Sequence, residues 1–166
     1  MKKRVEKLTA ERLQELVHYD PTTGIFTHRA PRKKIRVGEI AGTVDKASGY
    51  VILCIDRRRH YGHRLAFLYM TGEWPKQMVD HRDGNRANNV FDNLRDAPRL
   101  INQQNLRHAT AVSSSGLLGA YRKRSKWESR IRHCGQVIRL GVFATAEQAH
   151  DAYIRAKREL HDGCTI

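Results

Sequence analysis

The chain is poor in cysteine, and the few cysteines it has are far apart. Its 166 residues include three, Cys54, Cys134 and Cys164. None of them stands in the CxxC spacing of a zinc knuckle or zinc finger, so we expect no structural zinc. An odd number of dispersed cysteines also gives no disulfide framework, which is typical of a reducing compartment.

A long apolar run is missing as well. No stretch approaches the roughly 20 apolar residues of a membrane span. The N-terminus begins with charged residues but lacks the apolar core of a signal peptide. We therefore expect an intracellular protein that is neither secreted nor associated with a membrane.

Acidic residues are scarce beside basic ones. Lys and Arg total 31 and Asp and Glu total 17, which gives a net charge of +14 at pH 7. A field this positive favours polyanions, and nucleic acid is the commonest such partner. Basic ribosome-associated proteins share the property, so charge alone leaves both RNA and DNA open.

The sequence of the N-terminal third predicts a short helix and short strands. Apolar residues recur at helical spacing over residues 9–19, with Thr9 able to cap the helix. Strands are predicted at residues 25–27 and 49–55, each beside turn-forming residues. The arginines at 57–59 then lie at or beside a hairpin tip, as a solvated turn or as a phosphate contact.

A buried helix is predicted next, over residues 63–71, because its apolar positions wrap most of the way round. Gly72 is placed to end it. His63 opens this helix, and packing or a phosphate contact explains it more simply than catalysis, because the sequence places no partner beside it.

The most informative segment runs from residue 78 to residue 102. Met78 and Val79 can enter a strand, and residues 83–85 (DGN) form a turn that needs positive φ. Residues 93–95 (NLR) can form the returning strand. The neighbouring residues Asp83, Gly84, Asn85, Asn88 and Asn89 are typical turn residues.

A helix is predicted to follow this hairpin. Asp96 or Ala97 would cap it, with Pro98 in its first turn. Asn102 then lies near the beginning of the helix. A hairpin followed by a helix can bring Asp80, His81 and Asn102 together around one small volume.

These residue types suit phosphodiester hydrolysis. An imidazole, whose pKa is near ~6.5 in peptides, is a usable base at neutral pH, so His81 can activate water. Mg²⁺ prefers hard oxygen ligands and keeps several waters. The Asp80 carboxylate and the Asn102 amide oxygen would supply such ligands.

The segment resembles the HNH endonucleases of the ββα-metal group, and among them the homing and mobile nucleases of phages. The matching residues are Asp80-His81-x-Asp83-Gly84-Asn85, Asn88-Asn89, Asn93-Leu94-Arg95 and Asn102. The resemblance implies that His81 is the general base and that Asn93 orients this histidine and braces the loop. It also implies that Asp80 and Asn102 bind one divalent cation, Mg²⁺ or Mn²⁺. Many members have histidine where this chain has Asn102, and Asn105, one turn further along the same helix face, is the alternative ligand.

The C-terminal part predicts three strands and a helix. Strands are expected at residues 119–124, 127–133 and 137–143, and residues 145–148 (TAEQ) form a capping box. Small alanines on one stripe of the following helix let it lie close to the sheet. Ile131 and the apolar residues of the third strand are expected to face that helix.

The opposite face of this sheet is expected to be basic. Residues 116–145 contain seven cations and one acid, a balance of +6 (7 − 1), and a basic sheet face can bind the major groove of DNA. The predicted DNA-binding residues are Arg122, Lys123, Arg124, Trp127, Arg130, Arg132 and Arg139.

This region resembles the APETALA2/ethylene-response-factor (AP2/ERF) DNA-binding domain, a three-stranded sheet with one helix. The matching residues are Gly119, Lys126-Trp127, Ile131-Arg132, Gly135, Leu140-Gly141-x-Phe143, Thr145 and Ala149-x-x-Ala152-Tyr153. The resemblance implies that arginines and aromatic residues of the strands contact DNA. The start of the first strand departs from the usual aromatic pattern of that family.

Together these features predict an α+β protein with a β-rich N-terminal region, a ββα-metal nuclease core and a three-stranded antiparallel sheet packed on one helix. The expected domains are 1–62, 63–108 and 119–163, with a linker at 109–118. We expect a metal-dependent homing or nicking endonuclease that acts on double-stranded DNA without a small-molecule cofactor. It would work in the cytoplasm of a bacterial host or wherever its DNA target lies. The alternatives are a non-catalytic DNA-binding regulator with a degenerate HNH fold and an RNA-binding protein.

Overall fold

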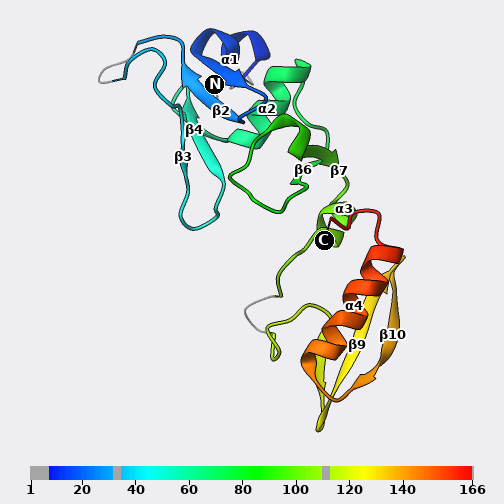
Figure 1. Cartoon of the computed structure of the whole chain (residues 1–166). Coiled ribbons are helices and arrows are strands. Elements are labelled where there is room, and N and C mark those ends of the chain that lie inside the picture. The colour runs from blue at the N-terminus through cyan, green and yellow to red at the C-terminus, as the bar shows by residue number, and fades with distance from the viewer. Residues whose placement is uncertain (1–7, 32–34, 110–112, 166) are drawn as a thin grey trace, which may run out of the picture. The chain divides into compact units, whose positions relative to one another are not determined.

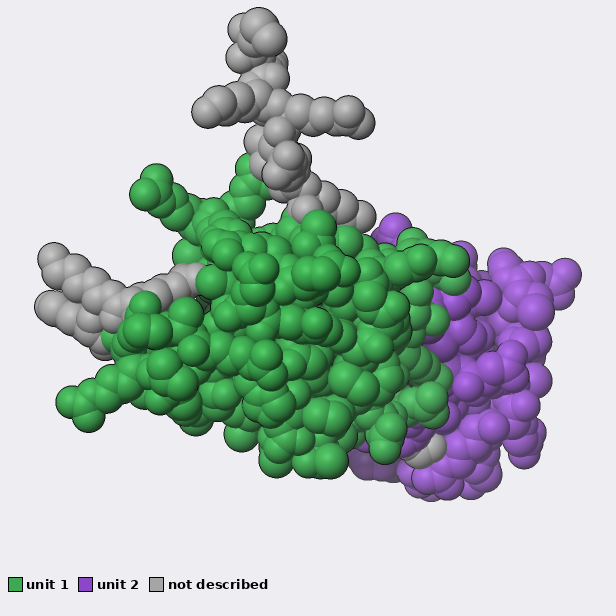
Figure 2. All heavy atoms as spheres, turned by 90° about the horizontal axis from the view of Figure 1, so that it is seen from above, with its two compact units in different colours: residues 1–96 green, residues 97–166 purple. Residues whose placement is uncertain are grey.

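The computed structural model describes residues 8–31, 35–109 and 113–165, and it combines short helices with four small sheets (Figure 1). The chain divides into two compact units, Met1–Asp96 and Ala97–Ile166 (Figure 2). This α+β organisation agrees with the expected fold class. No helix in the described residues is long and apolar enough to cross a membrane.

The first unit begins with helix α1 (Ala10–Leu16) and the hairpin β1 (Val17–Asp20) and β2 (Ile25–His28). The side chain of Thr9 caps α1 by accepting from the backbone N–H of Arg12, as predicted. The expected extension of this helix to residue 19 is wrong. Val17 and Tyr19 are buried on alternate positions of a strand, and pairing with β2 replaces the helical hydrogen bonds.

A second sheet supports the buried helix of this unit. Strands β3 (Thr43–Val44), β4 (Val51–Ile55) and β5 (Arg58–Tyr61) pair in that order. Helix α2 (Gly62–Thr71) follows β5 directly and ends at Gly72, whose φ of 77° is left-handed, as predicted. Leucines of α2 pack with residues of β1, β2 and β4 in one hydrophobic core.

The hairpin that carries the candidate site closes the first unit. Strand β6 (Met78–His81) pairs with β7 (Leu94–Ala97), and a 3₁₀ turn, η1 (Phe91–Asn93), precedes β7. Helix α3 (Arg99–Gln104) follows. The expected cap at Asp96 or Ala97 is wrong, because the N-cap position is Pro98. Both carboxylate oxygens of Asp96 instead accept backbone N–H groups of residues 76 and 77.

The second unit contains the predicted three strands and helix. Strands β8 (Ala120–Lys123), β9 (Lys126–His133) and β10 (Gln136–Phe143) form an antiparallel sheet in the order β10-β9-β8. Helix α4 (Ala146–Leu160) packs on this sheet and begins with the predicted capping box. Ala149 and Ile131 are buried, as expected for residues between helix and sheet.

The expectation that the apolar residues of β10 all face helix α4 is wrong. Val137 and Val142 are 50% and 49% exposed and do not face the helix. Their cross-strand partners are Arg132 and Glu128, which lie on the outer face of the sheet. A β-bulge between Arg139 and Gly141 shifts the register within the strand, so the apolar residues of β10 do not all point to one side.

Candidate functional site

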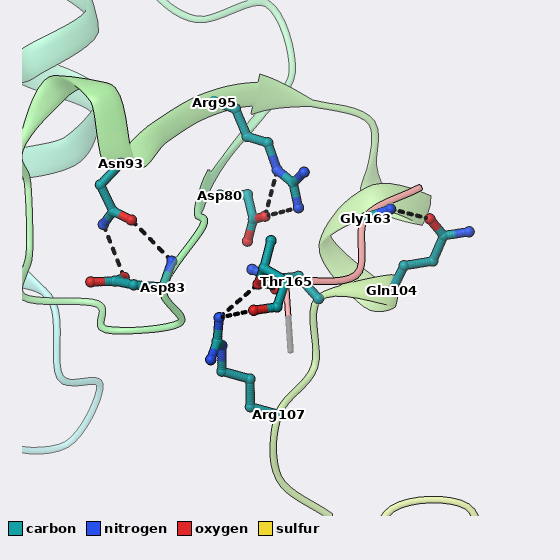
Figure 3. Close-up of polar contacts among 9 residues, drawn as sticks. Asp80, Asp83, Asn93, Arg95, Gln104, Arg107, Gly163 and Thr165 are labelled. Atoms are coloured by element: carbon teal, nitrogen blue, oxygen red, sulfur yellow. Dashed lines mark hydrogen bonds and ion pairs between the residues drawn. The ribbon is translucent and has the colours of Figure 1, made fainter. Parts of the chain in front are cut away.

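Asp80 and His81 lie at the end of β6 and point to opposite faces of the hairpin, as neighbouring strand residues do. Asp80 forms an ion pair with Arg95 of β7. The Nε and Nη2 atoms of Arg95 are 2.9 and 2.7 Å from Oδ2 of Asp80 (Figure 3). Both side chains are largely buried, which strengthens the pairing relative to one on the surface.

His81 is buried and hydrogen-bonded to Asn89. Its Nε2 atom is 3.2 Å from Oδ1 of Asn89, and both residues are buried. An amide oxygen can only accept, so this bond requires the proton of the neutral imidazole to be on Nε2. The second ring nitrogen, Nδ1, then carries the lone pair that can take a proton from water.

Burial also keeps His81 neutral. It lowers the pKa of His81, and the hydrogen bond to Asn89 opposes this only in part. The imidazole is therefore uncharged at pH 7, which is the form that a general base requires.

His63 lies beside His81, on the first turn of α2. Its ring is edge-on to that of His81, with 5.2 Å between the centroids, and it also packs on the ring of Tyr50. Burial lowers the pKa of His63 to about 3. Its Nδ1 atom is buried without a hydrogen-bond partner in the described part of the chain.

Asn93 braces the loop that joins β6 to β7. Its Oδ1 accepts the backbone N–H of Asp83 and its Nδ2 donates to the carboxylate of Asp83, each at 2.9 Å (Figure 3). Nδ2 also donates to the backbone carbonyl of Asn88. The side chain of Asn89 is hydrogen-bonded to the His81 ring, and the orienting role expected of Asn93 stays a prediction.

The sequence pattern predicts only a turn role for Asn89 and misses this contact. Its neighbours Asn85 and Asn88 do bond to backbone N–H groups two residues ahead, as turn residues do. Asn89 differs from these two neighbours in being buried. The residues that bury it are distant in sequence. The available sequence signal for this contact was the repeated Asn88-Asn89 within the HNH-like motif.

The two amides proposed from the sequence as metal ligands are both on or beside α3, in the second unit. Asn102 lies within the helix, and its Oδ1 is a buried oxygen with no hydrogen-bond partner among the described residues. Asn105 is the C-cap residue, and its Oδ1 accepts the hydroxyl of Thr165. Asn102 and Asn105 thus differ in whether their amide oxygen has a described partner, and both stay predicted ligands.

The donor set suits a hard cation rather than zinc. In the described residues, no group of three or more His, Cys, Asp and Glu side chains could hold a metal ion. The cation site expected on the Asp80 carboxylate and the Asn102 amide oxygen stays a prediction. Such oxygen ligands are typical of Mg²⁺ or Mn²⁺ sites that are completed by water and substrate phosphate.

The last residues of the chain contact α3 and the residues after it, and both belong to the second compact unit. Gln104 accepts the backbone N–H of Gly163 at 3.0 Å, and Arg107 donates to the carbonyl and hydroxyl of Thr165 at 2.9 and 2.7 Å (Figure 3). Lys157 of α4 donates to the backbone carbonyl of Leu106. These contacts make α3 part of the C-terminal unit.

The outer face of the β8–β10 sheet is defined by the strand register. Cross-strand partners lie on the same face, which places on it Tyr121, Lys123, Lys126, Glu128, Arg130, Arg132, Val137, Arg139 and Val142. The guanidinium of Arg130 lies 4.0 Å from the centroid of the Tyr121 ring. Glu128, the only acid in this set, is 3.1 Å from Lys123 and 3.8 Å from Arg139.

Two predicted DNA-binding residues lie elsewhere. Arg122 and Trp127 are cross-strand partners on the helix-facing side, the side of the buried Ser129. Trp127 is half-buried against the small core under α4, and the Arg122 guanidinium is 5.4 Å from its ring centroid. Arg124 occupies the tight turn between β8 and β9, with φ of 55°. The expectation that Arg122 belongs to the basic outer face is therefore wrong, and DNA binding by Arg122 and Trp127 stays a prediction.

Comparison with known families gives one match. Residues 60–104 match the family model described as HNH endonuclease. The matched segment begins in β5 and ends with α3, and it contains Asp80, His81, Asn93 and Asn102. Comparison with curated proteins and with solved structures finds no match.

This match supports a nuclease-type function with DNA as the substrate. The match also agrees with the geometry of the site, in which the neutral imidazole of His81 is hydrogen-bonded and lies on a braced hairpin. HNH nucleases generally use a divalent metal. The β8–β10 sheet and α4 lie outside the matched residues.

Proposed function

We propose that the chain is a metal-dependent endonuclease that hydrolyses phosphodiester bonds of double-stranded DNA, as a phage-type HNH homing or nicking enzyme. The observation that carries the proposal is the buried His81, bonded through Nε2 to Asn89 within the segment that matches the HNH family. This arrangement leaves Nδ1 as the basic nitrogen of the site.

His81 acts as the general base. Its Nδ1 takes a proton from water as the water oxygen forms a bond to phosphorus, and the bond from phosphorus to the 3′ oxygen breaks. The leaving oxygen gains a proton from solvent, which gives a 5′-phosphate and a 3′-hydroxyl. Asn93 keeps the loop after His81 in place through its bonds to Asp83 and Asn88.

Asp80 and Asn102 are the residues that would hold a divalent cation, Mg²⁺ or Mn²⁺. When bound, the cation supplies positive charge that stabilises the oxygen leaving phosphorus. Arg95 keeps the Asp80 carboxylate oriented through two bonds to Oδ2. Asn102 offers a buried amide oxygen that has no partner among the described residues.

The C-terminal unit binds the substrate as an AP2/ERF-like module. The outer-face cations Lys123, Arg130, Arg132 and Arg139 contact the DNA, and Arg124 contributes from the adjoining turn. Arginines on a sheet can reach phosphates or guanine edges in the major groove. The stacking of Arg130 on Tyr121 supports this role, because it holds the guanidinium on the outer face of the sheet.

Cleavage of supercoiled plasmid tests the nuclease proposal. Full-length wild type with Mg²⁺ or Mn²⁺ should cut plasmid DNA, while His81→Ala should lose at least about a hundredfold in rate, and chelation with EDTA should abolish cutting. His18→Ala is a matched control, because His18 is exposed on β1. If wild type and His81→Ala leave plasmids of varied sequence equally intact while both bind them, the protein is a DNA-binding regulator instead.

A competition experiment separates DNA from RNA as the partner. Labelled duplex DNA bound to the full chain should be displaced by unlabelled duplex DNA at lower concentration than by duplex RNA. The reverse order would favour the RNA-binding alternative.

A further inference from the structure

The backbone of Asn89 is held by the N-terminal hairpin, which is distant in sequence. The hydroxyl of Tyr19 donates to the Asn89 carbonyl at 2.6 Å, and each residue is only 1% exposed. Gly24 packs so closely that a Cβ there would lie 2.4 Å from the carbonyl carbon of Asn89. The backbone N–H of Phe91 donates to the carbonyl of Pro21 in the same hairpin turn.

The side chain of Asn89 is enclosed as well. Gly62, the first residue of α2, leaves the space that the amide occupies, and a Cβ there would lie 2.8 Å from Nδ2 of Asn89. Oδ1 faces Nε2 of His81. The amide therefore cannot rotate or shift without displacing α2 or the hairpin.

We propose that Asn89 is a positioning residue that fixes the Nε2–H tautomer and the ring orientation of His81, and that the β1–β2 hairpin serves the site by holding Asn89 through Tyr19 and Gly24. The catalytic consequence rests on the proposed nuclease function. Tyr19 and Gly24 lie outside residues 60–104, so this part of the site is outside the HNH match.

The physical reason is the acceptor oxygen that Asn89 places beside Nε2 of His81. A neutral imidazole has one proton and two nitrogens, and a hydrogen bond to one nitrogen decides which of them remains basic. When Asn89 loses its oxygen, the proton can occupy either nitrogen and the ring can turn. Fewer molecules then present the Nδ1 lone pair to water, so turnover should fall while substrate affinity stays the same.

The spectroscopic test uses the full-length protein with ¹⁵N-labelled histidine at a pH where His81 is neutral. The His81 ring signals are identified by their absence in His81→Gln. Wild type should show the Nε2–H tautomer. Asn89→Ala should shift the ring signals toward an average of both tautomers, and Asn89→Asp, which keeps an acceptor oxygen, should restore the wild-type tautomer.

The kinetic test uses the same variants. Asn89→Ala should lower kcat about 10- to 100-fold, as loss of an orienting partner does elsewhere, with KM unchanged. Tyr19→Phe and Gly62→Ala should each shift the tautomer in the same direction and lower kcat less. Tyr69→Phe is the matched control, because Tyr69 packs edge-on against Tyr19; it should behave as wild type. Circular dichroism verifies that each variant is folded.

The outcomes separate this inference from the nuclease proposal. An Nδ1–H tautomer in wild type, or a folded Asn89→Ala variant with unchanged ring signals, overturns the positioning role whatever the activity. If the tautomer depends on Asn89 but wild type cuts no DNA, the positioning role is supported and the nuclease proposal fails.

Discussion

His63 and His81 lie side by side but differ in what else they contact. The His81 ring has an amide oxygen beside Nε2, whereas Nδ1 of His63 is buried without a hydrogen-bond partner among the described residues. His63 also packs against the rings of Tyr50 and Tyr61. These contacts favour a packing role for His63, which must then stay uncharged in the folded protein.

The buried His63 should make the protein sensitive to acid. Its pKa is about 3 when folded and 6.5 when the imidazole is exposed to water, so the unfolded chain binds more protons below pH 6.5. The stability from this group is therefore complete above pH 6.5 and is lost as the pH falls toward 3. In urea unfolding at a series of pH values, His63→Phe should lose less stability than wild type between pH 6.5 and 4. The difference should approach about 1.4 kcal/mol per pH unit.

The exposed His18 provides the control for this measurement. His18→Phe should follow the wild-type pH profile, because the His18 side chain is exposed and lies outside the buried core. Parallel profiles for His63→Phe and wild type would contradict the neutral, buried state of His63.

At the scale of elements, the sequence predicted those helix ends and strand alternations that depend only on neighbouring residues. The capping box at Thr145, the end of α2 at Gly72 and the alternation of β9 are short-range patterns, and the structure agrees with each. The end of α1 was missed because pairing with β2, which lies beyond a turn, decided it. The orientation of β10 was missed because a bulge changes its register.

The same distinction applies to the candidate site. Asp80, His81 and Asn93 lie on one hairpin, which turn chemistry and spacing were enough to predict. The burial of Asn89 depends on Tyr19, Gly24 and Gly62, which a local pattern cannot connect to it. Local patterns therefore identify the proposed reacting groups and miss the residue that orients one of them.

Two glycines of the C-terminal unit provide a test of packing between α4 and its sheet. A Cβ on Gly119 would lie 2.1 Å from the Tyr153 ring, whereas Gly135 has nothing within 4 Å, and both have positive φ (72° and 79°). Gly135→Ala should cost only backbone strain, about 1 kcal/mol. Gly119→Ala should cost roughly 1–3 kcal/mol more, because the Tyr153 ring must move. Urea unfolding measures both, and equal losses would show that the close contact with Tyr153 is absent.

The outer face of the β8–β10 sheet should contribute salt-dependent affinity for DNA. Each phosphate contact releases condensed counterions, so losing one should reduce the slope of log affinity against log salt by about 0.9. Arg132→Gln should show this reduction in fluorescence anisotropy with duplex DNA. Arg155→Gln, which removes an exposed arginine from α4, is the matched control and should leave the slope unchanged. Equal slopes for both variants would place the DNA on another surface.

At the scale of the whole molecule, the proposed tasks divide between the two compact units. His81 and its supporting hairpin belong to residues 1–96, and the basic outer face belongs to residues 97–166. The net charge of +14 attracts DNA without regard to sequence. Each chain therefore combines one proposed hydrolytic centre with one basic binding face.

One centre per chain predicts the order in which plasmid forms appear. A single His81 can activate water at one strand in each encounter, so supercoiled plasmid should first become open circular DNA, and linear DNA should accumulate only after a lag. The lag should shorten as protein concentration rises, because a second, independent nick must fall near the first on the other strand. Gel analysis of a time course at several protein concentrations measures this. Linear DNA that forms from the start, at a rate proportional to that of open circles, would instead require two chains acting together on one site.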